Sequence, residues 1–194
     1  MLRIALIRPG STDYDQQYRI QGALDIPMNR HGRMEVAEVI EQLADQGIET
    51  VYAPACEPAQ ETGRAIAKGL GVKLKKLDRM QNLDQGLWQG MLVKDVRHKQ
   101  PKVYRQWQEQ PENVCPPEGE TLGHAEDRVR AALTKLLKRH RDGVIGLVLP
   151  EPLASLVRHF IQHDELGDLW KVTNGHSRWE ILDVEPEEVL AQGE

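Results

Sequence analysis

The amino-terminal stretch constrains the fold more than any other part of the chain. The segment Leu2–Ile7 is an almost continuous apolar run, and Arg8-Pro9-Gly10 follows it directly. Such a run, bounded by proline and glycine, is typical of a strand buried on both faces of a parallel sheet. The chain then leaves the sheet at its carboxyl edge, where open α/β folds place their ligands. We therefore expect residues 8–12 to lie at a functional site.

Strand and helix patterns alternate along the rest of the chain. Helices are predicted at residues 30–46, 58–70, 121–141 and 152–163, and strands at 50–53, 72–77, 143–149 and 178–184. The lysines that alternate through residues 72–77 indicate an edge strand. Alternating elements imply right-handed crossovers and a mostly parallel sheet with helices on both faces. The predicted fold class is therefore a three-layer α/β/α sandwich.

Residues 1–194 are expected to form a single domain. Residues 13–29 form a polar loop in this prediction, and residues 78–120 form a loop-rich insertion that folds over the carboxyl end of the sheet. One or two helices are expected within residues 93–108. The acidic tail from Glu185 is expected to be exposed.

Composition and net charge limit the kinds of molecule that this chain is expected to bind. Hydrophobic residues make up 40% and charged residues 28% of the chain, so we expect a globular protein. A net charge of −5 argues against a nucleic-acid or membrane partner. No signal peptide is evident, so we expect a cytoplasmic protein. Cys56 and Cys115 lack metal-ligand spacing, and we expect both to be reduced thiols that are at least half-buried. We predict no metal and no cofactor.

Several short motifs follow one another in a distinctive order. Arg19–Met28 is similar to the pattern R-x-Q-G-x-x-D-x-P-L, Gly86–Gly90 to G-x-W-E/Q-G, and Pro116–Thr121 to P-x-G-E-S/T. Arg8–Thr12 stands where an Arg-His-Gly motif would end the first strand. Together these motifs resemble those of the histidine phosphatase superfamily, which includes cofactor-dependent phosphoglycerate mutase. The resemblance covers about residues 3 to 184.

The resemblance implies a defined chemistry. In that family a histidine at the end of the first strand attacks phosphorus, two arginines and a second histidine neutralise the phosphoryl oxygens, and a carboxylic acid protonates the leaving oxygen. In this chain four of these positions carry other residues, namely Pro9 (nucleophile), Pro58 (second arginine), Asn82 (proton donor) and Pro150 (second histidine). Proline offers no nucleophile and no N–H, and an amide has no proton to give near neutral pH.

Arg8 is the one catalytic position that matches the family. The residual pocket is predicted to contain Arg8, Gly10, Ser11, Thr12, Asp15, Gln21, Gly22, Glu151 and His176. With Asp15 and Glu151 close to Arg8, phosphate binding is expected to be weak, although backbone N–H groups of residues 10–12 can hold an anion.

Three hypotheses about function follow. The main one is a catalytically inactive pseudoenzyme that binds a protein partner or forms a homodimer, because four catalytic positions are replaced together. The second is a phosphatase or phosphoglycerate mutase-type enzyme with relocated chemistry, using His31, His159 or His176. The third is a sensor whose remodelled pocket accepts a small ligand. Arg30-His31-Gly32 spells the catalytic tripeptide of the family, but it opens a predicted helix, so a solvated His31 is the expected reading.

Overall fold

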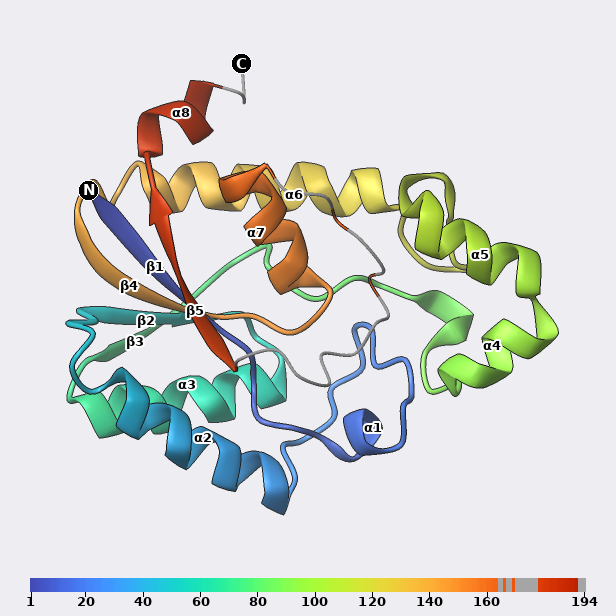
Figure 1. The fold of residues 1–194 in the computed structure, drawn as a ribbon, viewed down its shortest axis with the longest axis horizontal. Coiled ribbons are helices and arrows are strands. Elements are labelled where there is room, and N and C mark those ends of the chain that lie inside the picture. The colour runs from blue at the N-terminus through green and yellow to red at the C-terminus, as the bar shows by residue number, and fades with distance from the viewer. Residues whose placement is uncertain (164–165, 167–168, 170–177, 192–194) are drawn as a thin grey trace.

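A five-stranded mixed sheet lies at the centre of the structure, a computed structural model that describes residues 1–163, 166, 169 and 178–191 (Figure 1). The strand order is β3-β2-β4-β1-β5. The strands are β1 (Leu2–Ile7), β2 (Thr50–Ala53), β3 (Lys73–Lys76), β4 (Gly143–Val148) and β5 (Trp179–Val184). β1 to β4 are mutually parallel, and β5 pairs antiparallel with β1. The mostly parallel sheet expected from the sequence is confirmed, with β3 at one edge.

Helices cover both faces of this sheet (Figure 1). The α-helices are α1 (Asp13–Gln16), α2 (Arg30–Leu43), α3 (Glu57–Leu70), α4 (Val93–Lys99), α5 (Pro101–Glu109), α6 (Leu122–Leu137), α7 (Leu153–Gln162) and α8 (Pro186–Ala191). Two short 3-10 helices, η1 (Gly86–Trp88) and η2 (Pro111–Asn113), lie in the middle of the chain. The three-layer α/β/α class is therefore confirmed.

Two apolar clusters, one on each face, hold the layers together. On one face Leu2, Ile4 and Leu6 pack with residues of α6 and α7. On the other, Ala5 and Ile7 pack with residues of α2 and α3. The side chains of β1 therefore alternate between the two clusters, and Leu2, Ile4, Ala5, Leu6 and Ile7 have no exposed surface.

A third cluster lies beyond the carboxyl ends of the parallel strands, among α4, α5 and the facing ends of α6 and α7 (Figure 1). Trp88 and Trp107 meet edge to face within it, with ring centroids 6.2 Å apart. Both indoles are buried at 1–2% exposure, so they are packing residues. We call this group the third cluster below.

The structure corrects three expectations. Residues 13–29 are not wholly a loop, because Thr12 caps the short helix α1 in a reciprocal capping box with Asp15. The tail is not simply exposed, because α8 forms there, with Pro186 buried and Val189 against the core. Cys56 is half-buried as expected, but Cys115 is exposed.

Candidate functional site

The guanidinium of Arg8 lies at the carboxyl end of β1 with 7% of the residue exposed. Its Nε donates to Glu151 Oε1 over 2.7 Å, and its Nη2 donates to Glu180 Oε1 over 3.3 Å. Two carboxylates therefore neutralise this cation. The sequence predicted Glu151 beside Arg8, and it missed Glu180, which the antiparallel pairing of β5 with β1 brings there.

Glu151 and Asn82 connect this ion pair to neighbouring segments. Glu151 Oε2 accepts from the backbone N and from the Oγ of Ser155 in α7, at 3.2 and 2.7 Å. Asn82 Nδ2 donates to the carbonyl oxygens of Gly22 and Glu151, at 3.0 and 2.9 Å. Since both partners are carbonyls, the orientation of the amide is fixed, and Asn82 Oδ1 has no partner in the described part of the chain. Asn82, Gly22 and Glu151 thus lie together, with one buried acceptor available to a donor.

Asp15 occupies a different place from the one expected. Its Oδ2 accepts from the backbone N and the hydroxyl of Thr12, at 2.6 and 2.8 Å. The same hydroxyl lies 3.1 Å from Gln21 Oε1. The carboxylate of Asp15 therefore serves as part of the α1 cap, and the acidic partners of Arg8 are Glu151 and Glu180 instead.

The three prolines occupy loop and helix-start positions around the carboxyl ends of the strands. Pro9 and Pro150 follow the paired strands β1 and β4, and Pro58 is buried in the first turn of α3. The Gly10 backbone N donates to the hydroxyl of Thr62, one turn beyond Pro58, over 3.0 Å. None of these rings carries a group that can accept a phosphoryl group, so chemistry at this edge has to use other residues.

Glu35 forms hydrogen bonds and ion pairs with a second set of polar groups at the end of β1. It accepts from the backbone N and the hydroxyl of Ser11, at 2.9 and 3.1 Å, and it forms an ion pair with Arg178. His31 Nε2 lies 3.2 Å from Glu35 Oε1, one helical turn away on α2. Arg178 also donates to Ser11 Oγ over 2.6 Å and to the carbonyl of Pro9 over 3.2 Å. Glu35 and Arg178 were not among the residues predicted for the site; the four-residue spacing from His31 to Glu35 was the available signal.

The remaining candidate groups lie elsewhere. His159 lies on α7, with its ring centroid 5.8 Å from that of Phe160. His176 lies outside the described residues. Burial raises the pKa of the half-buried Cys56 thiol at the start of α3, which makes its thiolate less available. Among the described residues, no group of three His, Cys, Asp or Glu side chains is arranged to hold a metal.

Comparison with known proteins decides the family. The model of the histidine phosphatase superfamily (branch 1) matches residues 4–192. The chain belongs to this superfamily. The resemblance seen in the order of the motifs is therefore confirmed.

Relatives within the superfamily are named for reactions on phosphate esters. Phosphoserine phosphatase 1 of Hydrogenobacter thermophilus is 28% identical over 95% of this chain and 88% of its own length. The probable phosphoglycerate mutase GpmB of an Enterobacter species is 30% identical over 71% of this chain, and the match spans 64% of that protein, just under two thirds. The structure of a mycobacterial glucosyl-3-phosphoglycerate phosphatase superposes with a TM-score of 0.78 at 21% identity, covering 92% of this chain and 88% of that one. This last likeness supports the fold.

These relatives overturn the main functional hypothesis. A catalytically inactive pseudoenzyme was expected, yet the relatives that match 95% and 71% of the chain are named phosphoserine phosphatase 1 and probable phosphoglycerate mutase GpmB. The findings favour the alternative of a phosphatase or mutase-type enzyme. The pseudoenzyme hypothesis rested on the residues at four positions, Pro9, Pro58, Asn82 and Pro150. Within the described residues, no helix is long and apolar enough to cross a membrane.

Proposed function

We propose that this chain hydrolyses phosphate monoesters of small metabolites, by a route that does not use position 9. The observation that carries the proposal is the match over 95% of the chain to a protein named phosphoserine phosphatase 1. Phosphoserine and related small phosphorylated acids are the first substrates to test. Because Pro9 cannot be phosphorylated, the nucleophile has to come from another residue.

Among the residues that the structure describes, His31 is the histidine that we assign to that role. The His31 side chain is 60% exposed, so a substrate can reach the ring. Through Glu35 it is linked to Ser11 and Arg178 at the carboxyl end of β1. A carboxylate beside Nε2 favours the tautomer that carries its proton there, which leaves the Nδ1 lone pair available.

The chemical step uses His31, Glu35 and solvent water. His31 Nδ1 forms a bond to phosphorus as the ester P–O bond breaks, and the leaving oxygen takes a proton from solvent. Positive charge that develops on the ring is balanced by Glu35, which is the role a carboxylate plays beside a catalytic histidine. Water then attacks phosphorus, inorganic phosphate leaves and the neutral imidazole is restored.

Release of inorganic phosphate tests both parts of the proposal. Phosphoserine, 3-phosphoglycerate and p-nitrophenyl phosphate are each incubated with the purified chain and with a His31→Asn variant. We expect turnover above the buffer blank for at least one substrate, and a loss of about 100-fold or more in kcat/KM for the variant, since removing a nucleophile removes the covalent route. His124→Asn is the matched control, because His124, in the first turn of α6, is also exposed and lies 3.6 Å from Glu120.

Different results would contradict the phosphatase activity and the assignment of His31. Absence of phosphate release from the unaltered chain with all three substrates would contradict the phosphatase proposal. Turnover that is equal in the unaltered chain and in His31→Asn would contradict only the assignment of His31. Trapping of acid-labile phosphohistidine in the unaltered chain, and its loss in His31→Asn, is the direct positive result.

A further inference from the structure

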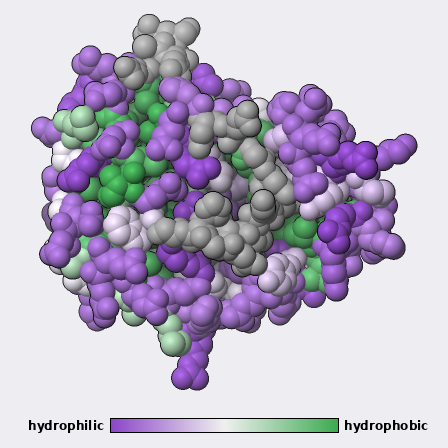
Figure 2. Space-filling view, viewed as in Figure 1, coloured by the Kyte–Doolittle hydropathy of each residue, from purple (hydrophilic) through white to green (hydrophobic). Residues whose placement is uncertain are grey.

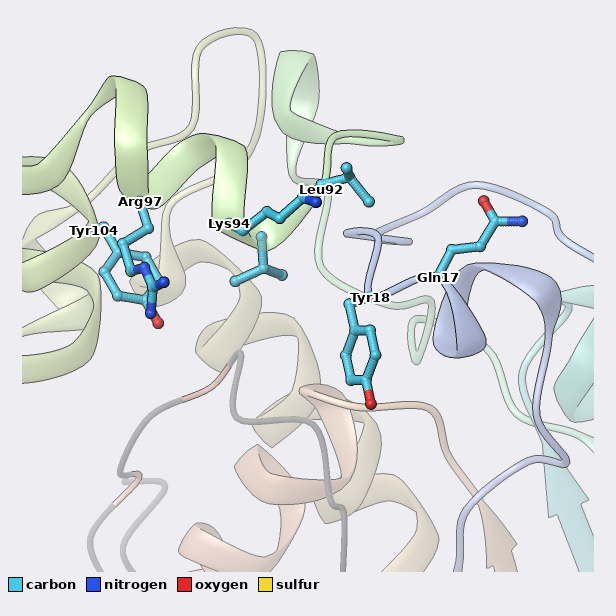
Figure 3. Close-up of a pocket in the computed structure, with 7 residues that line it drawn as sticks. Gln17, Tyr18, Leu92, Lys94, Arg97 and Tyr104 are labelled. Carbon is cyan, nitrogen blue, oxygen red and sulfur yellow. The ribbon is translucent and has the colours of Figure 1, made fainter.

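A cavity of about 340 Å³ lies between the turn after α1 and the helices α4 and α5. Gln17 and Tyr18 line it from the turn, Lys94 and Arg97 from α4, and Tyr104 from α5 (Figure 3). Leu92 and Val93 also line it. None of these residues belongs to the groups around Arg8 and Glu35. The volume falls at the small end of the usual range for ligand sites, about 300–1,000 Å³.

Backbone hydrogen bonds fix the two walls of this cavity relative to each other. The Val93 backbone N donates to the Tyr18 carbonyl over 3.0 Å, and Arg19 forms an isolated antiparallel bridge with Leu92. The guanidinium of Arg19 also donates to the Gly90 carbonyl over 2.6 Å. Because the walls are tied by main-chain bonds, the cavity exists before any ligand arrives, which reduces the entropic cost of binding.

Two cations, Lys94 and Arg97, line this cavity. Lys94 and Arg97 are three residues apart and so lie on one side of α4. In the part of the chain that the structure describes, neither has an acidic partner within ion-pair distance. Residues 94–105 hold five basic residues and one acidic residue, in a chain whose net charge is −5. Hydrophilic side chains accordingly cover most of the surface where α4 and α5 lie, on the right of Figure 2.

Tyr18 lines the same cavity as these cations. Its φ of 56° is in the left-handed region, which is costly for a residue with a bulky side chain. Hydrogen bonds hold it there, because its N donates to the Asp15 carbonyl over 3.2 Å and its carbonyl accepts from Val93. The residue is nevertheless 55% exposed. A strained, exposed tyrosine and two cations therefore line one cavity.

We propose that this cavity binds a small organic anion, whose phosphate or carboxylate group lies between Lys94 and Arg97 and whose apolar or ring portion packs on Tyr18, Leu92 and Val93. The cations supply charge-assisted hydrogen bonds, and the tyrosine ring covers the body of the ligand. The site is separate from the one proposed for hydrolysis, and it does not depend on that activity.

Calorimetric titration with phenylphosphonate tests this site. The probe carries both an oxyanion and a ring, and its C–P bond resists hydrolysis, so binding is measured without turnover. We expect saturable binding that weakens as sodium chloride is raised. Inorganic phosphate and phenol, each with half of the recognition elements, should bind more weakly. A K94A/R97A double variant should bind phenylphosphonate at least about tenfold more weakly, because two charged hydrogen-bond donors are lost.

Two further variants separate this site from general charge attraction. K102A/R105A removes the same charge from α5 outside the cavity and should leave the affinity unchanged. Tyr18→Gly removes the ring at a position where glycine fits the backbone without strain, so the variant should fold normally and bind several-fold more weakly. The proposal is overturned if the unaltered chain does not bind the probe, if K94A/R97A binds it equally well, or if K102A/R105A loses as much affinity.

Discussion

Arg8 and Glu151 join the carboxyl ends of two paired strands, with Arg8 Nε 2.7 Å from Glu151 Oε1. The same carboxylate also accepts from the Ser155 backbone N in the first turn of α7, so one side chain fixes a strand end and a helix start. An arginine that is 7% exposed and held in this way is unavailable to an incoming phosphate while Glu151 is present.

Removal of the Glu151 carboxylate should therefore change stability and anion binding in opposite directions. Glu151→Ala is expected to lower the free energy of unfolding by about 2–4 kcal/mol, because it leaves a mostly buried guanidinium with one fewer partner. Added phosphate should raise the Tm of the variant more than that of the unaltered chain. Urea unfolding and thermal shift with and without phosphate measure these effects. The exposed Glu109→Ala is the control, and an unchanged unfolding free energy for Glu151→Ala would contradict this account.

Arg128 should be among the largest single contributors to stability on α6. Its guanidinium donates to both carboxylate oxygens of Glu120, at 3.1 and 2.6 Å, and to the carbonyls of Arg79, Gln81 and Asn82, at 3.2, 2.7 and 3.2 Å. Arg128→Ala is expected to lower the unfolding free energy by about 3–5 kcal/mol, since it breaks a mostly buried ion pair and removes the donor to three carbonyls. Urea denaturation is the measurement. The exposed Arg139→Ala should cost under about 0.5 kcal/mol, and equal losses in the two variants would contradict the prediction.

Two glycines near helix starts should respond oppositely to alanine. A Cβ on Gly32 would lie 2.5 Å from the Ser11 backbone N and 2.7 Å from Met28 Cγ, so Gly32→Ala is expected to lower the unfolding free energy by about 2 kcal/mol or more. A Cβ on Gly123 meets no atom within 4 Å, so Gly123→Ala is expected to raise it by up to about 1 kcal/mol. Thermal and urea unfolding compare the two. A Gly32→Ala variant as stable as the original would show that the loop after β1 can move away from α2.

His140 should make stability depend on pH below neutrality. The Tyr52 hydroxyl and His140 Nε2 are 2.8 Å apart, and burial, followed by the charge of Lys75, lowers the pKa of His140. A lowered pKa means that the unfolded chain takes up the proton first, so this contribution to stability is lost as pH falls through the ordinary histidine range. Between pH 7.5 and pH 5.5 the unaltered chain should lose more unfolding free energy than His140→Gln. Equal losses would mean that His140 is not coupled to folding.

Local patterns predicted most of the architecture. β2 has the bounds expected for it, and α2 begins at Arg30 because the Asn29 side chain accepts from the Gly32 backbone N. Apolar periodicity and capping residues are local signals, and they specify elements of this length. The helices α1 and α8 were missed because four to six residues carry too little periodicity.

The partners within the site could not be predicted in the same way. Glu180 reaches Arg8 only because β5 lies antiparallel beside β1, with Glu180 opposite Leu6. Arg178 and Glu35 are 143 positions apart, and strand order rather than any local pattern brings them together. Sequence identified which residue types were absent at the family's positions, but it could not show which charges would be assembled around them.

The third cluster has a consequence for how members of this family can diverge. The lobe that carries α4 and α5 has an apolar interior of its own, with Trp88 and Trp107 at its centre, and it rests on only one end of α6 and α7. Its outer residues, Lys94 and Tyr104 among them, can therefore be exchanged without repacking the sheet. Selection for new ligands can act on this lobe while the strands that carry Arg8 stay as they are.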